Sequence, residues 1–201
     1  MILNRLEYAV VNNPVRATMQ RHWVAKRLLR MGGPVPGGTV LEIGCGRGIG
    51  VEIILDLFEA KHVDAFDLDA RMISRAQNRL RRRAEQVRLW EGDVTAIEAD
   101  KDQYDAVFDF GVVHHVPDWR LALSEVYRVL KPGGRFYAEE GLKKLITHWL
   151  VRRLSVHPQE DRFTHEQFCA AMEAMGFDVI DSKEMPGGFG WYVAEKPAVV
   201  S

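Results

Sequence analysis

Short apolar runs alternate with longer amphipathic segments along most of the chain. The apolar runs predict strands near residues 39–43, 62–67, 86–91, 104–110 and 135–139. The segments between several of them predict helices near 48–60, 70–84 and 118–130. Because strands separated by helix-length segments build parallel sheets, this pattern predicts a doubly wound α/β fold.

The C-terminal part of the chain changes this pattern. A helix near 164–175 leads to Gly176, a natural helix stop, and two strands follow near 177–184 and 189–196. Only the short turn Pro186-Gly187-Gly188 separates the two strands, so they should pair antiparallel. We therefore expect a mainly parallel, seven-stranded, Rossmann-like sheet with an antiparallel final strand.

Two helical segments lie outside this alternation. Residues 1–31 are loosely amphipathic and are broken at Asn12-Asn13-Pro14, and residues 141–154 carry a basic amphipathic pattern. At 201 residues a single domain is expected. We divide it into a helical cap (1–38), a core (39–140), a lid over the pocket (141–163) and a C-terminal helix with a strand pair (164–201). The lid segment could instead contact a membrane or a partner.

The most informative local pattern follows the first strand. Glu42 lies inside an apolar strand, and Gly44, Gly46, Gly48 and Gly50 then alternate into the next helix. Glycine permits positive φ and close approach of the backbone to a ligand. A helix N-terminus behind such a turn presents unpaired N–H groups to an anion. The pattern predicts a nucleotide-type cofactor loop.

The glycine spacing restricts the type of cofactor. A dinucleotide fingerprint, G-x-G-x-x-G, would need its third glycine at Ile49 or at Val51, and the Gly-Lys-Ser/Thr of a Walker loop is absent. The remaining pattern, E-x-G-x-G-x-G at 42–48, resembles the first motif of the class I S-adenosylmethionine (SAM)-dependent methyltransferases.

Further segments resemble the same family in the same order. These are Asp64–Asp69 at the end of the second strand, Trp90–Thr95 at the end of the third, Tyr104–Trp119 with its His-His-Val sequence, and Val129–Phe136. The fourth-strand segment is similar to small-molecule methyltransferases, including the ubiquinone/menaquinone carbon methyltransferases. The resemblance spans residues 39–196 and implies SAM as cofactor and S-adenosylhomocysteine as product.

The resemblance also implies residue roles. Cofactor contacts are expected from Glu42, Gly44, Cys45, Gly46, Gly48, Asp67, Leu68, Met72, Asp93, Val94, Asp109 and Phe110. Asp67 would accept hydrogen bonds from the ribose hydroxyls, as an acidic residue at the end of a second strand can do. Asp69 either contacts the ligand or caps the following helix. Asp109 would bind the amino group of the methionine end through its carbonyl or its carboxylate.

Three residues are candidates for catalysis. His114 and His115 follow the fourth strand, and a histidine with a near-neutral pKa suits a general base. Either histidine could instead cap the next helix or pack the loop. Glu139, with Glu140 beside it, ends the fifth strand and could act as a base or hold a substrate cation. Carboxylates also suit Mg²⁺, but the Asp-Asn pair of catechol-type enzymes is not evident, and we expect no metal.

Composition limits the class of partner. The formal net charge is −1, which shows no global bias toward nucleic acid, and Arg81-Arg82-Arg83 is interpreted as a solvated helix end. The mostly apolar cap and lid favour a small apolar or amphipathic acceptor. Two distant cysteines and the lack of a signal peptide or a bilayer-spanning apolar run favour the cytoplasm. We expect a monomer or a homodimer.

The expected reaction is methyl transfer from SAM to a small acceptor. Two alternatives stay open: a SAM-binding regulatory protein without turnover, and an aminopropyltransferase-like enzyme, which would need an acidic polyamine pocket. No Asn/Asp-Pro-Pro-Tyr/Phe sequence follows the fourth strand, which argues against methylation of DNA bases.

Overall fold

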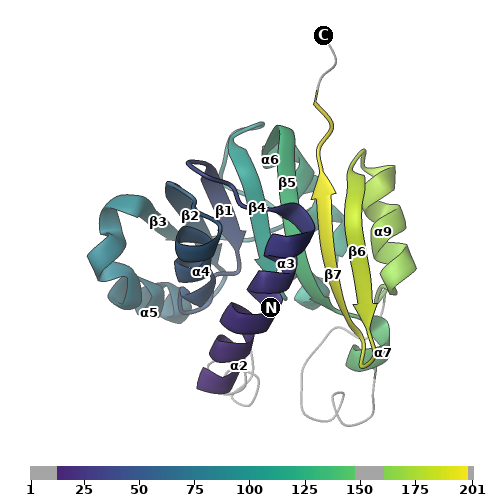
Figure 1. The fold of residues 1–201 in the computed structure, drawn as a ribbon, viewed down its shortest axis with the longest axis horizontal. Helices are drawn as coiled ribbons and strands as arrows, with labels where there is room; N and C mark the ends of the chain where they lie inside the picture. The colour runs from purple at the N-terminus through teal and green to yellow at the C-terminus, as the bar shows by residue number, and fades with distance from the viewer. Residues whose placement is uncertain (1–12, 148–160, 199–201) are drawn as a thin grey trace.

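The computed structural model describes residues 13–147 and 161–198, and their strands form one seven-stranded sheet (Figure 1). The order across the sheet is β3-β2-β1-β4-β5-β7-β6. The strands are β1 Thr39–Ile43, β2 His62–Asp67, β3 Val87–Glu91, β4 Tyr104–Phe110, β5 Leu130–Gly141, β6 Asp178–Met185 and β7 Phe189–Glu195. The order therefore reverses between β1 and β4, near the middle of the sheet.

The strand directions confirm the predicted fold class. The pairs β1–β2, β1–β4, β2–β3 and β4–β5 are parallel. The final strand, β7, lies antiparallel to both of its neighbours, β5 and β6. The turn between β6 and β7 contains Gly187 and Gly188, whose φ angles of 120° and 86° suit glycine.

Helices cover both faces of the sheet. They are α2 Pro14–Met19, the π-helix Gln20–Val24, α3 Ala25–Gly32, α4 Ile49–Leu57, α5 Ala70–Leu80, the 3₁₀ segments Arg81–Gln86 and Val113–His115, α6 Trp119–Val129, α7 Lys143–Ile146 and α9 His165–Ala174. Helices α3, α4 and α5 contribute to one apolar core, and α6 and α9 to the other. The sheet between these two cores is doubly wound, as predicted.

Several element boundaries differ from the predicted ones for local reasons. The helix predicted at 48–60 ends at Leu57, and Glu59 just beyond it has a left-handed φ of 62°. The helix predicted at 70–84 ends at Leu80 and continues as a 3₁₀ segment, where Arg83 leaves helical geometry. The strand predicted at 135–139 extends to Gly141 because β7 pairs with it that far.

The described part of the predicted cap packs directly on the sheet. The Asn13 side chain accepts a hydrogen bond from the Val15 N–H at 2.8 Å and caps the start of α2. Leu28 of α3 is fully buried, and the Tyr137 hydroxyl donates to the Gly32 carbonyl at 3.0 Å. These contacts make α3 part of one core with the sheet.

The predicted lid is described only at its two ends. Helix α7 covers the start of the helix predicted at 141–154, and the Lys143 N–H donates to the Phe163 carbonyl at 2.9 Å. Residues 148–160 of the lid, with Trp149 and Leu150, lie outside the described residues, as do residues 1–12 of the cap. Within the described ranges, no helix combines the length and apolarity needed to cross a bilayer.

Candidate functional site

A pocket of about 390 Å³ lies at the carboxyl ends of the central parallel strands. It includes residues that follow β1, β2, β3 and β4, together with Arg16 of α2. Its lining residues include Arg16, Gly44, Gly46, Asp67, Leu68, Asp69, Met72, Asp93, Val94, Phe110, Val112 and His115. Because the strand order reverses between β1 and β4, this is the position at which open α/β sheets bind ligands.

The glycine loop forms the floor of the pocket. Gly44 has a φ of 62°, and a Cβ there would lie 2.3 Å from a methyl carbon of Val112. Gly46 has a φ of 52°, and a Cβ there would meet no atom within 4 Å. Gly48, with a φ of 82°, is the residue that precedes α4. The loop therefore presents bare backbone to an open space.

Glu42 lies beneath this loop rather than in the pocket. It is only 2% exposed, and its Oε1 occupies the space that a side chain at Gly50 would need. Burial raises the pKa of Glu42 well above its usual value, and the charges of Asp67 and Asp109 raise it further. Cys45 is also buried and absent from the pocket lining; its N–H donates to the Phe66 carbonyl. Glu42 and Cys45 thus lie where they support the loop.

Asp67 joins the loops after β1 and β2. Its Oδ2 accepts from the Gly46 N–H at 2.9 Å, and its Oδ1 accepts from the Asp69 N–H at 2.9 Å. Burial raises the pKa of Asp67, and these two hydrogen bonds lower it. Each carboxylate oxygen has two acceptor sites, so Asp67 keeps capacity for hydroxyl donors of a ligand in the pocket.

Apolar and polar side chains from the segments after β2 and β3 form another part of the pocket lining. Leu68 is 39% exposed and Met72 is buried, and both line the pocket with Val94. Asp93 also lines it, and its Oδ1 accepts from the N–H and the hydroxyl of Thr95. Leu68, Met72, Asp93 and Val94, predicted from separate segments, thus come together.

Asp69 caps the helix that follows it. Its Oδ1 accepts from the Arg71 N–H at 2.9 Å, and its carboxylate pairs with the Arg71 guanidinium at 2.6 Å. The helix-capping alternative for Asp69 is therefore confirmed. Asp69 also lines the pocket, but its carboxylate is committed to Arg71.

A cluster of buried acidic side chains supports the loop after β4. Glu140 is fully buried, accepts from the N–H groups of Val113 and His114 at 2.8 and 3.0 Å, and contacts His114 Nδ1. Asp109 is also fully buried, and its Oδ1 accepts from the Val112 N–H at 2.8 Å. Burial and then the charge of Glu140 raise the pKa of Asp109 well above its usual value. The Asp109 side chain is therefore directed into this cluster and does not line the pocket.

The two histidines lie in different environments. His115 lines the pocket, whereas His114 is held by Glu140 and packs against the backbone of Gly111 and Gly141. Their rings lie 4.2 Å apart between centroids. His115 therefore lies in the pocket, whereas His114 supports its wall.

Arg16 is a charged pocket residue that sequence reasoning missed. Its Nη2 donates to the Phe110 carbonyl at 3.3 Å, which places a cation at the end of β4 in the pocket lining. Arg16 lies in a segment without any recognisable motif, so no signal in the sequence singles it out. The charge of Arg16 also acts on Glu139. Burial raises the pKa of Glu139, Arg16 lowers it and Asp109 raises it, and the resulting value is about 7. Glu139 itself is 9% exposed and does not line the pocket.

Metal ligands do not gather at this site. Among the described residues, no group of three or more His, Cys, Asp or Glu side chains has the arrangement to hold a metal ion.

Comparison with known proteins adds a family assignment. A methyltransferase domain profile matches residues 40–134. The chain is 33% identical over 111 residues to phosphoethanolamine N-methyltransferase 2 of Caenorhabditis elegans (55% of this chain, 25% of that protein). It is 30% identical over 155 residues to a probable S-adenosylmethionine-dependent methyltransferase of Mycolicibacterium smegmatis (77% of this chain, 57% of that protein). The chain therefore spans about a quarter and somewhat more than half of these two relatives.

Longer overlap is seen with two other proteins. The chain is 26% identical to the ubiquinone/menaquinone biosynthesis C-methyltransferase UbiE of Brucella anthropi, with 92% of this chain and 82% of that protein covered. The solved structure of a SAM-dependent methyltransferase from Aquifex aeolicus superposes with a TM-score of 0.74 at 18% identity, covering 94% and 97% of the two chains. This second likeness concerns the fold alone.

The raised pKa of Glu139 predicts a pH-dependent stability. A carboxyl group whose folded pKa is raised stabilises the fold at low pH, and this contribution is lost as the pH rises from about 4.5 through about 7. Glu139→Gln should therefore unfold like the unmodified protein at pH 5 and be about 2–3 kcal/mol more stable than it at pH 8. Urea unfolding at both pH values measures this. The exposed Glu98→Gln is the control, and equal pH dependence in all three proteins would contradict the prediction.

Proposed function

The chain belongs to the class I SAM-dependent methyltransferases, and we propose that it transfers the methyl group of SAM to a small-molecule acceptor by in-line displacement. The observation that carries this proposal is the hydrogen bond from Gly46 to Asp67, which joins two cofactor motifs in one pocket. Bound SAM supplies a methyl group already activated on a sulfonium. The protein has mainly to align the acceptor atom with that methyl group, and such alignment can supply much of the rate.

The residues of the pocket fit the cofactor. The open space at Gly46 suits a ligand that approaches the backbone closely. We assign the ribose hydroxyls to Asp67, the adenine ring to Leu68 and Met72, and the adenine edge to Asp93 and the backbone of Val94. The Asp93 carboxylate suits the polar edge of an adenine, and the apolar side chains beside it suit the face of the ring.

The methionine end fits the opposite part of the pocket. We assign its carboxylate to Arg16 and the glycine-loop backbone, because an anion gains most from a guanidinium and from free N–H groups. We assign its amino group to backbone carbonyls near Asp109 and Phe110. The Asp109 carboxylate is the weaker alternative because it faces Glu140 and holds a raised pKa.

The acceptor is assigned to the same end of the pocket. His115 lines it and is therefore our proposed general base, needed only if the acceptor must lose a proton early. His114 and Glu140 act as positioning residues, since they hold the loop that carries His115. We propose a small apolar or amphipathic acceptor because Phe110 and Val112 line the pocket together with His115. We propose a reducing cytoplasm as the location because both described cysteines are free.

The direct test is a transfer assay with methyl-labelled SAM. The purified protein is incubated with labelled SAM and with fractionated small-molecule extracts, and label is followed into the extract and into S-adenosylhomocysteine. Label transfer that is lost on boiling supports the proposal. SAM binding by calorimetry without any transfer would favour the regulatory alternative and overturn the proposed reaction.

Loss of the Asp67 carboxylate should weaken SAM binding. Asp67→Ala removes the acceptor for the ribose and the tie to Gly46, so SAM affinity should fall by about 1–3 kcal/mol, measured by calorimetry. Asp69→Asn is the matched control, because it removes one charge from the same loop and can still cap α5. Unchanged SAM affinity in Asp67→Ala would refute the assignment.

Arg16 offers a test of the cofactor's orientation. Arg16→Gln should weaken SAM and S-adenosylhomocysteine by about tenfold or more, the scale of one charge-assisted hydrogen bond. It should leave decarboxylated SAM almost unaffected, because that analogue has no carboxylate. Arg21→Gln, which breaks an ion pair with Asp56 at 2.5 Å on the same segment, serves as control. Equal losses for all three ligands would show that Arg16 does not hold the carboxylate.

A further inference from the structure

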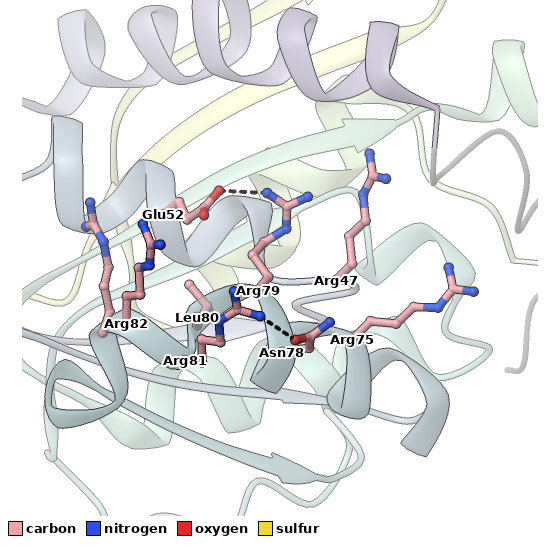
Figure 2. A pocket seen from close by; sticks show the side chains of 9 residues that line it. Arg47, Glu52, Arg75, Asn78, Arg79, Leu80, Arg81 and Arg82 are labelled. Atoms are coloured by element: carbon pink, nitrogen blue, oxygen red, sulfur yellow. Dashed lines mark hydrogen bonds and ion pairs between the residues drawn. The ribbon is translucent and has the colours of Figure 1, made fainter.

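A second hollow includes Arg47 of the glycine loop and shares no lining residue with the cofactor pocket. It has a volume of about 750 Å³ and is lined by residues of the loop before α4, of α4, of α5 and of the 3₁₀ segment after α5 (Figure 2). Six of its lining residues are arginines: Arg47, Arg75, Arg79, Arg81, Arg82 and Arg83. The other three are Glu52, Asn78 and Leu80.

Arginines outnumber carboxylates among the residues that line this arginine hollow. Glu52 is the single carboxylate among the lining residues, and it pairs with Arg79 at 3.0 Å. Arg83 pairs with Asp56 at 2.7 Å, outside the lining. Arg81 donates to the neutral side chain of Asn78 at 3.1 Å (Figure 2). Cations therefore outnumber carboxylates in the hollow, although the whole chain carries a net charge of −1.

Arg47 gives a second, independent indication of a ligand. Its Nε is buried and donates no hydrogen bond to any described residue. A buried donor without an acceptor is costly, and an anion in the hollow would satisfy it. Burial lowers the pKa of Arg47, and the nearby charges of Arg79 and Arg75 lower it further. These like charges repel one another unless an anion lies between them.

The helix dipole explains only part of this arrangement. Arginines at the C-terminal end of α5 are favourable to the dipole, which accounts for Arg79 and the segment after it. It does not account for Arg47, which lies in a different loop, nor for Arg75, one turn earlier. Arg75 and Arg79 are four residues apart, a spacing at which like charges destabilise a helix. Glu52 pairs with Arg79 and offsets part of this repulsion, and a bound anion would reduce it further.

We propose that the arginine hollow binds a small molecule that carries two or more adjacent phosphate groups. The planar guanidinium matches phosphate oxygens in pairs, and several guanidiniums around one hollow match a short row of phosphates. None of the lining residues is aromatic, so the hollow has no surface on which a base would stack. The arginines line one hollow, and the whole chain carries a net charge of −1, which favours a compact ligand over a nucleic-acid backbone.

The site also touches the cofactor loop. Arg47 stands between Gly46, which lines the cofactor pocket, and Gly48, which precedes α4. An anion held by Arg47 would therefore bind a side chain of the cofactor loop itself, without entering the cofactor pocket.

The test uses inorganic tripolyphosphate as the probe and the full chain in calorimetry at low ionic strength. We expect micromolar binding that weakens with added salt. The triple variant Arg75→Ala, Arg81→Ala, Arg82→Ala should bind at least about tenfold more weakly, because it removes three guanidinium partners of the phosphates. The control Arg30→Ala, Arg88→Ala, Arg120→Ala removes the same charge from exposed positions outside the hollow and should bind like the unmodified protein. Thermal unfolding checks that both variants are folded.

Four results would overturn the proposal. The first is no binding to the unmodified protein, and the second is an equal loss in both triple variants. The third is competition by saturating S-adenosylhomocysteine, which would put the anion in the cofactor pocket. The fourth is tighter binding of an RNA duplex of about ten base pairs through the same arginines, which would identify a nucleic-acid backbone as the ligand. None of these results depends on methyl transfer.

Discussion

The hydrogen bond from the Gly46 N–H to the Asp67 carboxylate is the interaction on which the pocket depends. It ties the glycine loop after β1 to the end of β2, and Asp67 also fixes the next turn through the Asp69 N–H. Burial opposes the charge of this carboxylate, and the two N–H groups favour it. The glycine loop and Asp67 lie close together because the carboxyl ends of the parallel strands meet at one edge of the sheet.

A second set of buried carboxyl groups has a structural role at the same edge. Glu42 fills the space beside Gly50, and Glu140 holds the backbone at Val113 and His114. Burial raises the pKa of both groups, to about 7 for Glu140. That value already includes the lowering effects of a hydrogen bond with Asp109 and of the backbone N–H groups of His114 and Val113. The wall of the pocket is thus held by side chains that do not line it.

The glycine loop lies between two different environments. Gly46 faces the mixed apolar and polar pocket, whereas Arg47 belongs to the arginine hollow. Arg16 reaches the pocket from α2 and interacts with Phe110, 94 residues further along the chain. Arg16 and the glycine loop thus line the same pocket, while Arg47 of the loop lines the arginine hollow.

The sequence by itself determined the strand and helix alternation, the antiparallel final strand, the glycine loop and the position of Asp67. These signals are local, because apolar periodicity and glycine spacing act within a few residues. Only the tertiary structure decided that His115 and not His114 lines the pocket, that the Asp109 carboxyl turns toward Glu140, and that Arg16 belongs to the site. Which side of a strand end or turn a side chain faces depends on what packs against it. The partners of His114, Asp109 and Arg16 come from distant segments, so no local pattern can specify these choices.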